Sequence, residues 1–263
     1  MGAMGLGMKA SNLAQNHARQ FGRAAVAPPE KTRRVQGVFD SVAAKYDVMN
    51  DAMSLGWHRV WKRIFTGMVG ARDGMDVLDL AGGTGDITRA MHRMAPSARY
   101  TVCDLTPAMM EVGKKRLWNA GIAGVNWVQG DAADLPFDDG MFDRVVISFG
   151  LRNVTFLDRA LTEARRVLRP GGKFYCLEFT TLPHAGAQKI YEVYNRVLIP
   201  QLGAMIAGDR ASYDYLIESI ARFPAAPDLC DMMRAAGFAA PDYRYLTGGI
   251  VAAHWGTNQP KLR

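Results

Sequence analysis

Short apolar runs alternate with amphipathic stretches from residue 76 to residue 179, and this alternation predicts most of the fold. Each run is too short for a helix and rich in Val, Ile, Leu or Phe, which is typical of a buried strand. The predicted strands are residues 76–80, 99–104, 126–130, 142–149 and 173–179. Because helix-length segments join them, we expect an α/β fold with a doubly wound parallel sheet and helices on both faces.

Two of the intervening helices have recognisable ends. Thr106 is placed to cap a helix that begins at Pro107, and that helix is expected to run through Leu117. Another helix follows the apolar positions over 157–168. Pro170 and the two glycines after it are expected to end that helix in a turn.

The segments before and after these strands depart from the alternation. Residues 38–68 contain a helical pattern, and residues 185–223 predict two helices around a break at Gly208. A further helix near 228–236 and two strands, 242–246 and 249–255, complete a predicted seven-stranded sheet. We expect 38–68 and 185–223 to form a helical cap over the carboxyl ends of the strands, where open parallel sheets bind ligands. The apolar residues expected on one side of the first cap helix are Val60, Trp61, Ile64, Phe65 and Met68.

Composition and charge narrow the class of protein. The chain has 263 residues and a net charge of +7, and residues 1–35 hold six basic residues against Glu30. This stretch is predicted to be a flexible basic extension over residues 1–34, followed by a single domain over 35–263. No apolar run approaches the roughly 18 residues of a membrane span. The three cysteines lie far apart, so neither a disulfide framework nor a metal site is expected.

A glycine-rich turn after the strand at 76–80 is the most informative segment. The sequence VLDLAGGTGD occupies 77–86, and its three glycines let a ligand approach bare backbone. Its spacing matches neither the dinucleotide fingerprint nor the phosphate loop of nucleotide hydrolases. Two flanking carboxylates, Asp79 and Asp86, oppose a pyrophosphate and suit a ligand with a cationic end and neutral hydroxyls.

Acidic residues also end the next two predicted strands. Asp104 is placed to accept hydrogen bonds from both hydroxyls of a ribose. Asp131, followed by the backbone N–H of Ala132, is placed to bind the edge of adenine. A nucleoside that carries a positive charge and no phosphate is S-adenosylmethionine. Each carboxylate alone would be explained by capping a strand or helix end, but the three together predict a methyltransferase.

Longer motifs resemble the ubiquinone/menaquinone biosynthesis C-methyltransferase family over about residues 35–256. The most specific are YDVMND at 46–51 and SFGLRNV at 148–154. Others are SLGWHR at 54–59, LAGGTGD at 80–86, RVLRPGG at 166–172, LEF at 177–179, SYDYLIESI at 212–220 and LTGG at 246–249. The resemblance implies a class I S-adenosylmethionine-dependent methyltransferase fold, with a mostly parallel seven-stranded sheet and a helical cap.

The same resemblance implies the residues of the cofactor site. They are Asp79, Gly82, Gly83, Thr84, Gly85, Asp104, Leu105, Asp131, Ala132 and Ser148. The chain departs from the family pattern at Thr106, where many members have Asn, and this exchange still supplies a helix cap.

The implied reaction is C-methylation of a polyprenylated methoxy-benzoquinol in ubiquinone biosynthesis, with a demethylated menaquinol as a further acceptor in some bacterial relatives. Arg152 is the first catalytic candidate, because a guanidinium can stabilise a phenolate or hold a water that takes the phenol proton. Asn153 is expected to orient the ring oxygen, and Tyr46 to complete the donor set from the cap. An ion pair of Arg152 with Asp143 or Glu178 is the structural alternative.

Other interpretations stay open at the level of sequence. The acceptor can be another small phenol or lipid, and the chain can instead serve as a scaffold for a quinone-synthesis complex. A lipid-soluble substrate predicts peripheral contact with a membrane, at the bacterial cytoplasmic face or the matrix side of a mitochondrial inner membrane. A homodimer and a quinone-biosynthesis complex are the other partners considered. Nucleic acid is not expected, because the chain after its basic start is nearly neutral.

Overall fold

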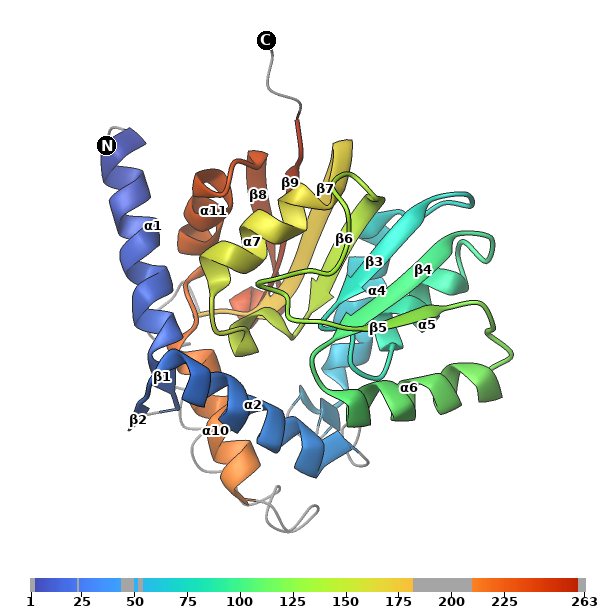
Figure 1. Ribbon diagram of the computed structural model, residues 1–263, viewed down its shortest axis with the longest axis horizontal. Coiled ribbons are helices and arrows are strands. Elements are labelled where there is room, and N and C mark those ends of the chain that lie inside the picture. The colour runs from blue at the N-terminus through green and yellow to red at the C-terminus, as the bar shows by residue number, and fades with distance from the viewer. Residues whose placement is uncertain (1–2, 23, 44–49, 52–53, 182–209, 260–263) are drawn as a thin grey trace.

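The computed structural model describes residues 3–22, 24–43, 50–51, 54–181 and 210–259. In these residues a seven-stranded sheet is covered by helices on both faces (Figure 1). Its strands are β3 (Asp76–Leu80), β4 (Arg99–Asp104), β5 (Asn126–Gln129), β6 (Phe142–Ser148), β7 (Leu168–Phe179), β8 (Ala239–Leu246) and β9 (Val251–Thr257). The helices are α1 (Ala3–Ala18), α2 (Pro28–Val42), α4 (Trp57–Val69), α5 (Asp86–His92), α6 (Pro107–Asn119), α7 (Leu157–Arg166), α10 (Arg210–Arg222), α11 (Ala226–Ala235) and the 3-10 helices η2 (Leu151–Asn153) and η4 (Thr247–Gly249). A small hairpin joins β1 (Gln20–Phe21) to β2 (Ala24–Ala25).

The strand order places a switch in direction at the centre of the sheet. The order is β5-β4-β3-β6-β7-β9-β8, parallel from β5 to β7, with β9 antiparallel to both of its neighbours. Leu80 pairs with Cys103 on one side and with Ile147 on the other, so β3, β4 and β6 end at the same level. The chain leaves β3 toward β4 and β5 and then returns to β6, which opens a crevice at the strand ends.

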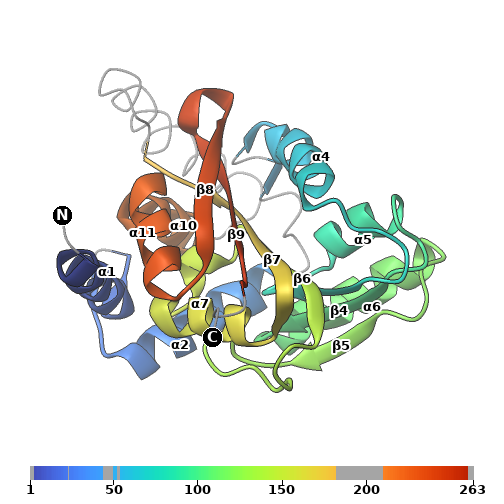
Figure 2. The same cartoon turned by 90° about the horizontal axis from the view of Figure 1, so that it is seen from above.

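Alternate residues of the central strands enter two hydrophobic cores on opposite faces of the sheet. Val77 and Val146 pack in the core that includes α4, α5 and α10. Leu78 and Ile147 pack in the core that includes α1, α7 and α11. Figure 2 shows α4 and α5 on one side of the sheet and α1, α7 and α11 on the other. Because the central strands are buried on both faces, their apolar runs were recognisable in the sequence.

The five predicted strands are confirmed, and those at 76–80 and 99–104 have the predicted bounds. The prediction is wrong at the start of β7. Helix α7 ends at Arg166, and the Pro-Gly-Gly segment lies inside the strand and not in a helix-ending turn. The Gly171 N–H donates to the carbonyl of Asn258 over 2.7 Å, and the Asn258 N–H donates to the carbonyl of Gly172 over 2.9 Å. This pairing with the chain beyond β9 recruits the segment into the sheet.

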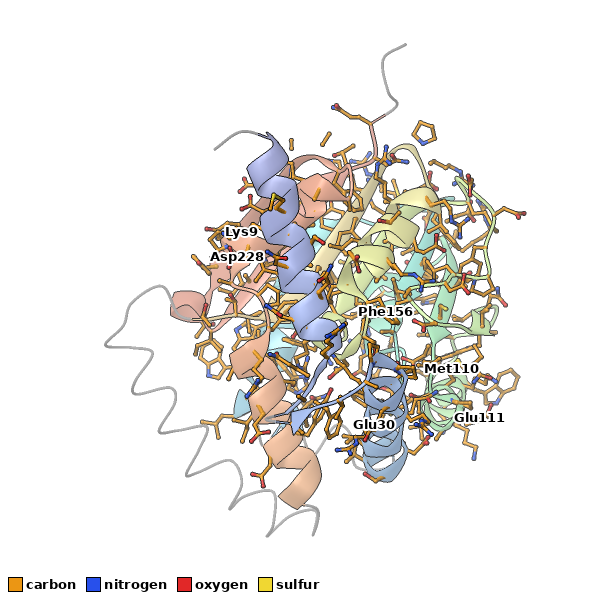
Figure 3. The ribbon with its side chains drawn as sticks, turned by 60° about the vertical axis from the view of Figure 1, so that its left-hand side comes forward. Lys9, Glu30, Met110, Glu111, Phe156 and Asp228 are labelled. Atoms are coloured by element: carbon orange, nitrogen blue, oxygen red, sulfur yellow. The ribbon has the colours of Figure 1, made fainter. Side chains whose placement is uncertain are left out.

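The flexible extension over residues 1–34 stays a prediction, and the part of it that the structure describes contains helix α1, the β1–β2 hairpin and the start of α2. Helix α1 packs against α7 and α11 and buries Ala10 and Ala14. Small side chains at this spacing let helices approach closely. Lys31 is 2% exposed, and its Nζ donates to the carbonyl of His17 over 2.7 Å. Lys9 points toward Asp228 and forms an ion pair at 2.5 Å (Figure 3).

The cap differs from the prediction in extent and orientation. Its first helix, α2, begins at Pro28 and not at residue 38, and it lies against α6 (Figure 3). In α4, Trp61 and Phe65 are buried but Val60 and Ile64 are exposed, so the prediction that these residues share one side is wrong. Of the second predicted cap element, α10 belongs to the described residues, whereas 185–209 lie outside them.

Candidate active site

A cleft at the carboxyl ends of β3, β4, β5 and β6 gathers most of the predicted cofactor residues. It encloses about 960 Å³, counting the space open to solvent. Helix α2 covers it with Thr32, Val35, Gln36 and Phe39. Of the residues predicted for the cofactor, those that line the cleft are Asp79, Gly82, Gly83, Thr84, Asp104, Leu105, Asp131, Ala132 and Ser148.

The glycines of the loop after β3 have separate steric roles. A Cβ on Gly82 would stand 2.8 Å from Val102 Cγ1 and 2.9 Å from Asp79 Cγ, which leaves no room for a side chain. Gly83 has a φ of +53°, and its N–H donates to Asp104 Oδ2 over 2.8 Å. Gly85, predicted as a cofactor residue, is not among the residues that line the cleft. It is the N-cap residue that precedes α5 and has a φ of +72°, a conformation that favours glycine.

Two buried polar atoms in the wall of the cleft lack partners among the described residues. One oxygen of Asp79 accepts hydrogen bonds from the Thr88 N–H and Oγ1, at 3.1 and 2.8 Å. Its other oxygen, Oδ1, and the Oγ of Ser148 have no hydrogen-bond partner there. Burial raises the pKa of Asp79 to about 7. Because buried polar atoms are normally paired, a polar or cationic ligand fits this wall.

Asp104 is held rigidly at the end of β4. Its two oxygens accept from the N–H groups of Gly83 and Thr106, each over 2.8 Å. Burial raises the pKa of Asp104, and these hydrogen bonds to the carboxylate act against that rise. A carboxylate oxygen has more than one acceptor position, so both oxygens can still accept from the hydroxyls of a ribose. The ribose-binding role of Asp104 stays a prediction.

Lys62 is a residue of the cleft that the sequence reasoning missed. Its Nζ lies 3.0 Å from Asp86 Oδ2, and Arg116 donates to Asp86 Oδ1 and to Thr84 Oγ1 over 3.1 Å. Burial pushes the pKa of Asp86 up, but the charge and hydrogen bonds of Lys62 and Arg116 outweigh this and hold it below its ordinary value. Two cations around one carboxylate make this side of the loop suitable for an anionic group. The prediction that Asp86 adds negative charge here is therefore incomplete.

The loops after β3 and β6 meet beneath the cleft in strained backbone. Ala81 and Phe149 have φ values of +49° and +55°, in the left-handed region that residues with a Cβ rarely adopt. A Cβ on Gly150 would lie 2.8 Å from the Cβ of Ala81. All three residues line the cleft. Strain of this kind persists where surrounding contacts fix the chain, and it is concentrated at functional sites.

Arg152, the first catalytic candidate, is not among the residues that line the cleft. The guanidinium is buried and donates to Glu178 Oε1 over 2.9 Å and to the carbonyl of Phe149. The Arg152 N–H also donates to Glu178 Oε2 over 3.2 Å. Burial raises the pKa of Glu178, and the charge of Arg152 acts against that rise. The structure thus realises the ion-pair alternative with Glu178, while Asp143 pairs with Arg169 at 2.7 Å.

Asn153 is the catalytic candidate that faces the cleft. It lines the cavity, and the hydroxyl of Tyr215 donates to its Oδ1 over 3.1 Å. This bond orients the side-chain amide from below. Tyr215, on α10, was not predicted as a site residue. No sequence pattern relates it to Asn153, and the two come into contact only in the fold. Tyr46, the third catalytic candidate, lies outside the described residues.

Comparison with known sequences gives the family. The sequence model of the ubiE/COQ5 methyltransferase family matches residues 28–258. The chain belongs to this family. It is 49% identical to the ubiquinone/menaquinone biosynthesis C-methyltransferase UbiE of Ruegeria sp. (strain TM1040), an alignment that covers 90% of this chain and 95% of that protein. It is 43% identical to the mitochondrial 2-methoxy-6-polyprenyl-1,4-benzoquinol methylase of Danio rerio, over 94% and 86% of the two chains.

Solved structures agree on the fold. A SAM-dependent methyltransferase from Aquifex aeolicus matches with a TM-score of 0.59 at 14% identity, over 83% of this chain and 97% of that one. The [4+2]-cyclase SpnF matches with a TM-score of 0.58 at 17% identity, over 87% and 96%. Because one neighbour is named a cyclase, these likenesses carry the fold and not the reaction. The family membership makes the protein a methyltransferase, with S-adenosylmethionine as its cofactor.

Proposed function

We propose that this methyltransferase transfers a methyl group from S-adenosylmethionine to a ring carbon of a polyprenylated methoxy-benzoquinol, a step of ubiquinone biosynthesis. The observation that carries the proposal is the identity over nearly full length to relatives named for quinone methylation, one bacterial and one mitochondrial. The cleft supports it, because Val35 and Phe39 give its cover apolar groups and Asn153 adds a polar one.

The cofactor supplies a methyl group on a sulfonium, which is already a good leaving group. In the proposed binding mode Asp104 accepts from the ribose hydroxyls, and Asp131 with Ala132 binds the adenine. Lys62 pairs with the carboxylate of the methionine part, and the unpartnered oxygen of Asp79 faces its cationic groups. These contacts hold the donor so that the acceptor carbon can approach in line.

The acceptor reacts as a quinol, because an ionising phenol makes the adjacent ring carbon a nucleophile. With the cofactor bound, the new carbon–carbon bond would form as the carbon–sulfur bond breaks. S-adenosylhomocysteine would be the leaving group, and the ring carbon would pass its proton to solvent, to which the cleft is open. We assign Asn153 to hold the ring oxygen through its amide, which Tyr215 fixes. Arg152 acts as a positioning residue, since its bonds to Glu178 and to the Phe149 carbonyl hold the η2 turn that carries Asn153.

Labelled methyl transfer to a short-tailed demethylated benzoquinone, with and without a chemical reductant, tests the proposal. Mass spectrometry should find the label on a ring carbon only under reducing conditions. Asn153→Ala should lower kcat roughly a hundredfold with the affinity for the cofactor unchanged, and the exposed Asn119→Ala is the matched control. Label on an oxygen would show O-methylation and would overturn the proposed transfer to carbon. An absence of label in both conditions, with the cofactor bound, would favour the scaffold interpretation.

A naphthoquinol is the second acceptor class, favoured by the bacterial relatives whose name includes menaquinone biosynthesis. The same assay with a demethylated naphthoquinone tests it.

We also infer a peripheral position at a membrane, on the bacterial cytoplasmic face or the matrix side of the mitochondrial inner membrane, because the substrate is a lipid. Within the described residues, no helix combines the length and apolarity that crossing a bilayer requires. A homodimer and a quinone-biosynthesis complex stay predictions.

A further inference from the structure

Helix α4 carries two adjacent apolar stripes, and the protein core accounts for only one of them. Trp61, Phe65 and Val69 are between 0% and 3% exposed and pack in the core against the sheet. Trp57, Val60 and Ile64 follow one another at spacings of three and four residues and form a second stripe, roughly 100° around the helix from the first. These three side chains are 50%, 45% and 39% exposed. Figure 2 shows α4 at the outside of its layer, beside α5.

The exposed apolar groups are concentrated at this helix. Eight large apolar side chains of the described residues are exposed, and four of them lie within residues 55–64. The fourth is Leu55, which precedes the helix with a φ of +48° and is 66% exposed. Single exposed apolar residues are ordinary, whereas a contiguous patch indicates an interaction surface. We call Leu55, Trp57, Val60 and Ile64 the α4 outer face.

Basic residues border the α4 outer face. Arg59 and Arg63 are exposed and lie one turn apart, adjacent to Val60 and Ile64. Arg59 forms an ion pair with Asp51, and helix α4 itself contains no acidic residue. An apolar stripe with a Trp and a basic border is the pattern of helices that lie in the interface of an anionic bilayer. Tryptophan favours the level of the lipid headgroups.

We propose that the α4 outer face docks the protein on the surface of a bilayer that contains anionic lipid. The inner side of the same helix carries Lys62, which lines the cleft. Docking through α4 therefore brings the cleft within about one helix diameter, roughly 10 Å, of the lipid. This arrangement suits an acceptor with a polyprenyl tail, and in this respect the inference rests on the proposed function.

Sedimentation with vesicles of phosphatidylcholine, with or without phosphatidylglycerol, tests the inference without any quinol. The triple variant Trp57→Ser, Val60→Ser, Ile64→Ser should bind either vesicle about tenfold less than the unmodified chain. Arg63→Glu should remove only the increase in vesicle binding that phosphatidylglycerol causes. The matched control is Trp118→Ser, because Trp118 is 74% exposed on a different helix, α6. Cofactor affinity and turnover of a short-tailed quinol should be unchanged in the triple variant, which shows that it is folded.

Unchanged vesicle binding by the triple variant would overturn the inference. The inference would also be overturned if the unmodified chain formed a dimer, the triple variant were a monomer and both bound vesicles equally. The α4 outer face would then join two copies of the chain. If vesicle binding falls as expected but no quinol is methylated by any variant, the proposed function fails and the docking surface stands.

Discussion

The cofactor half of the cleft and the helices that cover it are built from contacts of different range. In the cofactor half, Asp79 accepts from Thr88, and Gly83 donates to Asp104, so partners lie 9 and 21 residues apart. In the cover, Thr32 bonds to Thr155 over 2.7 Å, and Trp61 donates to Thr247 over 2.7 Å. Those partners are 123 and 186 residues apart.

This difference explains where the sequence patterns succeed. A strand of the central sheet is buried on both faces, so its continuous apolar run is enough to predict its burial. A cover helix has more than one side that could be buried, and the pattern alone does not select between them. Val60 and Ile64 therefore appear equivalent to Trp61 and Phe65 in the sequence, although the sheet covers only the latter pair.

The buried ion pair of Arg152 with Glu178 should show the largest effect on stability. Glu178→Gln leaves the buried Arg152 without a countercharge and should lower the free energy of unfolding by about 3–5 kcal/mol. Urea unfolding measures this change. Glu111→Gln, which removes one partner of the exposed pair with Lys114, should have no comparable effect. An equal loss of unfolding free energy in the two variants would show that the Arg152–Glu178 pair does not stabilise the fold as a buried ion pair.

The cover should contribute a pH dependence through Lys31. Burial lowers its pKa from 10.5 to about 7. Between these values the unfolded chain binds a proton that the folded chain does not, so this group makes stability rise with pH across that window. Lys31→Met should remove a rise of roughly 2–4 kcal/mol in the free energy of unfolding with pH. The measurement is urea unfolding at several pH values from 7 to 9. The exposed Lys115→Met should keep the wild-type slope, and an unchanged slope in Lys31→Met would place this lysine in solvent.

The cofactor half should respond in binding more than in stability. Asp104→Asn keeps the shape of the side chain but removes the charge that strengthens hydrogen bonds to a ribose. Affinity for S-adenosylmethionine should fall roughly tenfold to a hundredfold, as measured by titration calorimetry. Asp138→Asn, at an exposed carboxylate, is the control. Wild-type affinity in Asp104→Asn would remove Asp104 from the cofactor site.

The smallest effect on stability is expected at the solvent-exposed surface of helix α1. The Lys9–Asp228 pair is exposed to solvent, and such pairs contribute little to stability. Lys9→Ala should leave the Tm unchanged within error, whereas Ala14→Asp, which buries a charge between α1 and its neighbours, should lower it clearly. Thermal unfolding of the two variants distinguishes packing from charge as the force that holds α1. A larger fall in Tm in Lys9→Ala than in Ala14→Asp would show that charge, and not packing, holds α1.

The sequence by itself determined the central strands, the seven-stranded α/β class, the glycine loop and the acidic residues at the strand ends. Parallel strands place their carboxyl ends together, so residues such as Asp79, Asp104 and Asp131 converge whatever the details of packing. The family motifs, which a sequence carries without any structure, added the class of reaction.

Only the tertiary structure decided how the remaining parts meet. It turned Arg152 toward Glu178 and away from the cleft, brought Tyr215 to Asn153, and placed Lys62 beside Asp86. It also packed α1 against α7 and α11 and buried Lys31, which composition had suggested to be a charge in solvent. In each case the partner is distant in sequence or lies on a different element. Periodicity reports that a residue is buried or charged, but the identity of its neighbour depends on how separate elements pack.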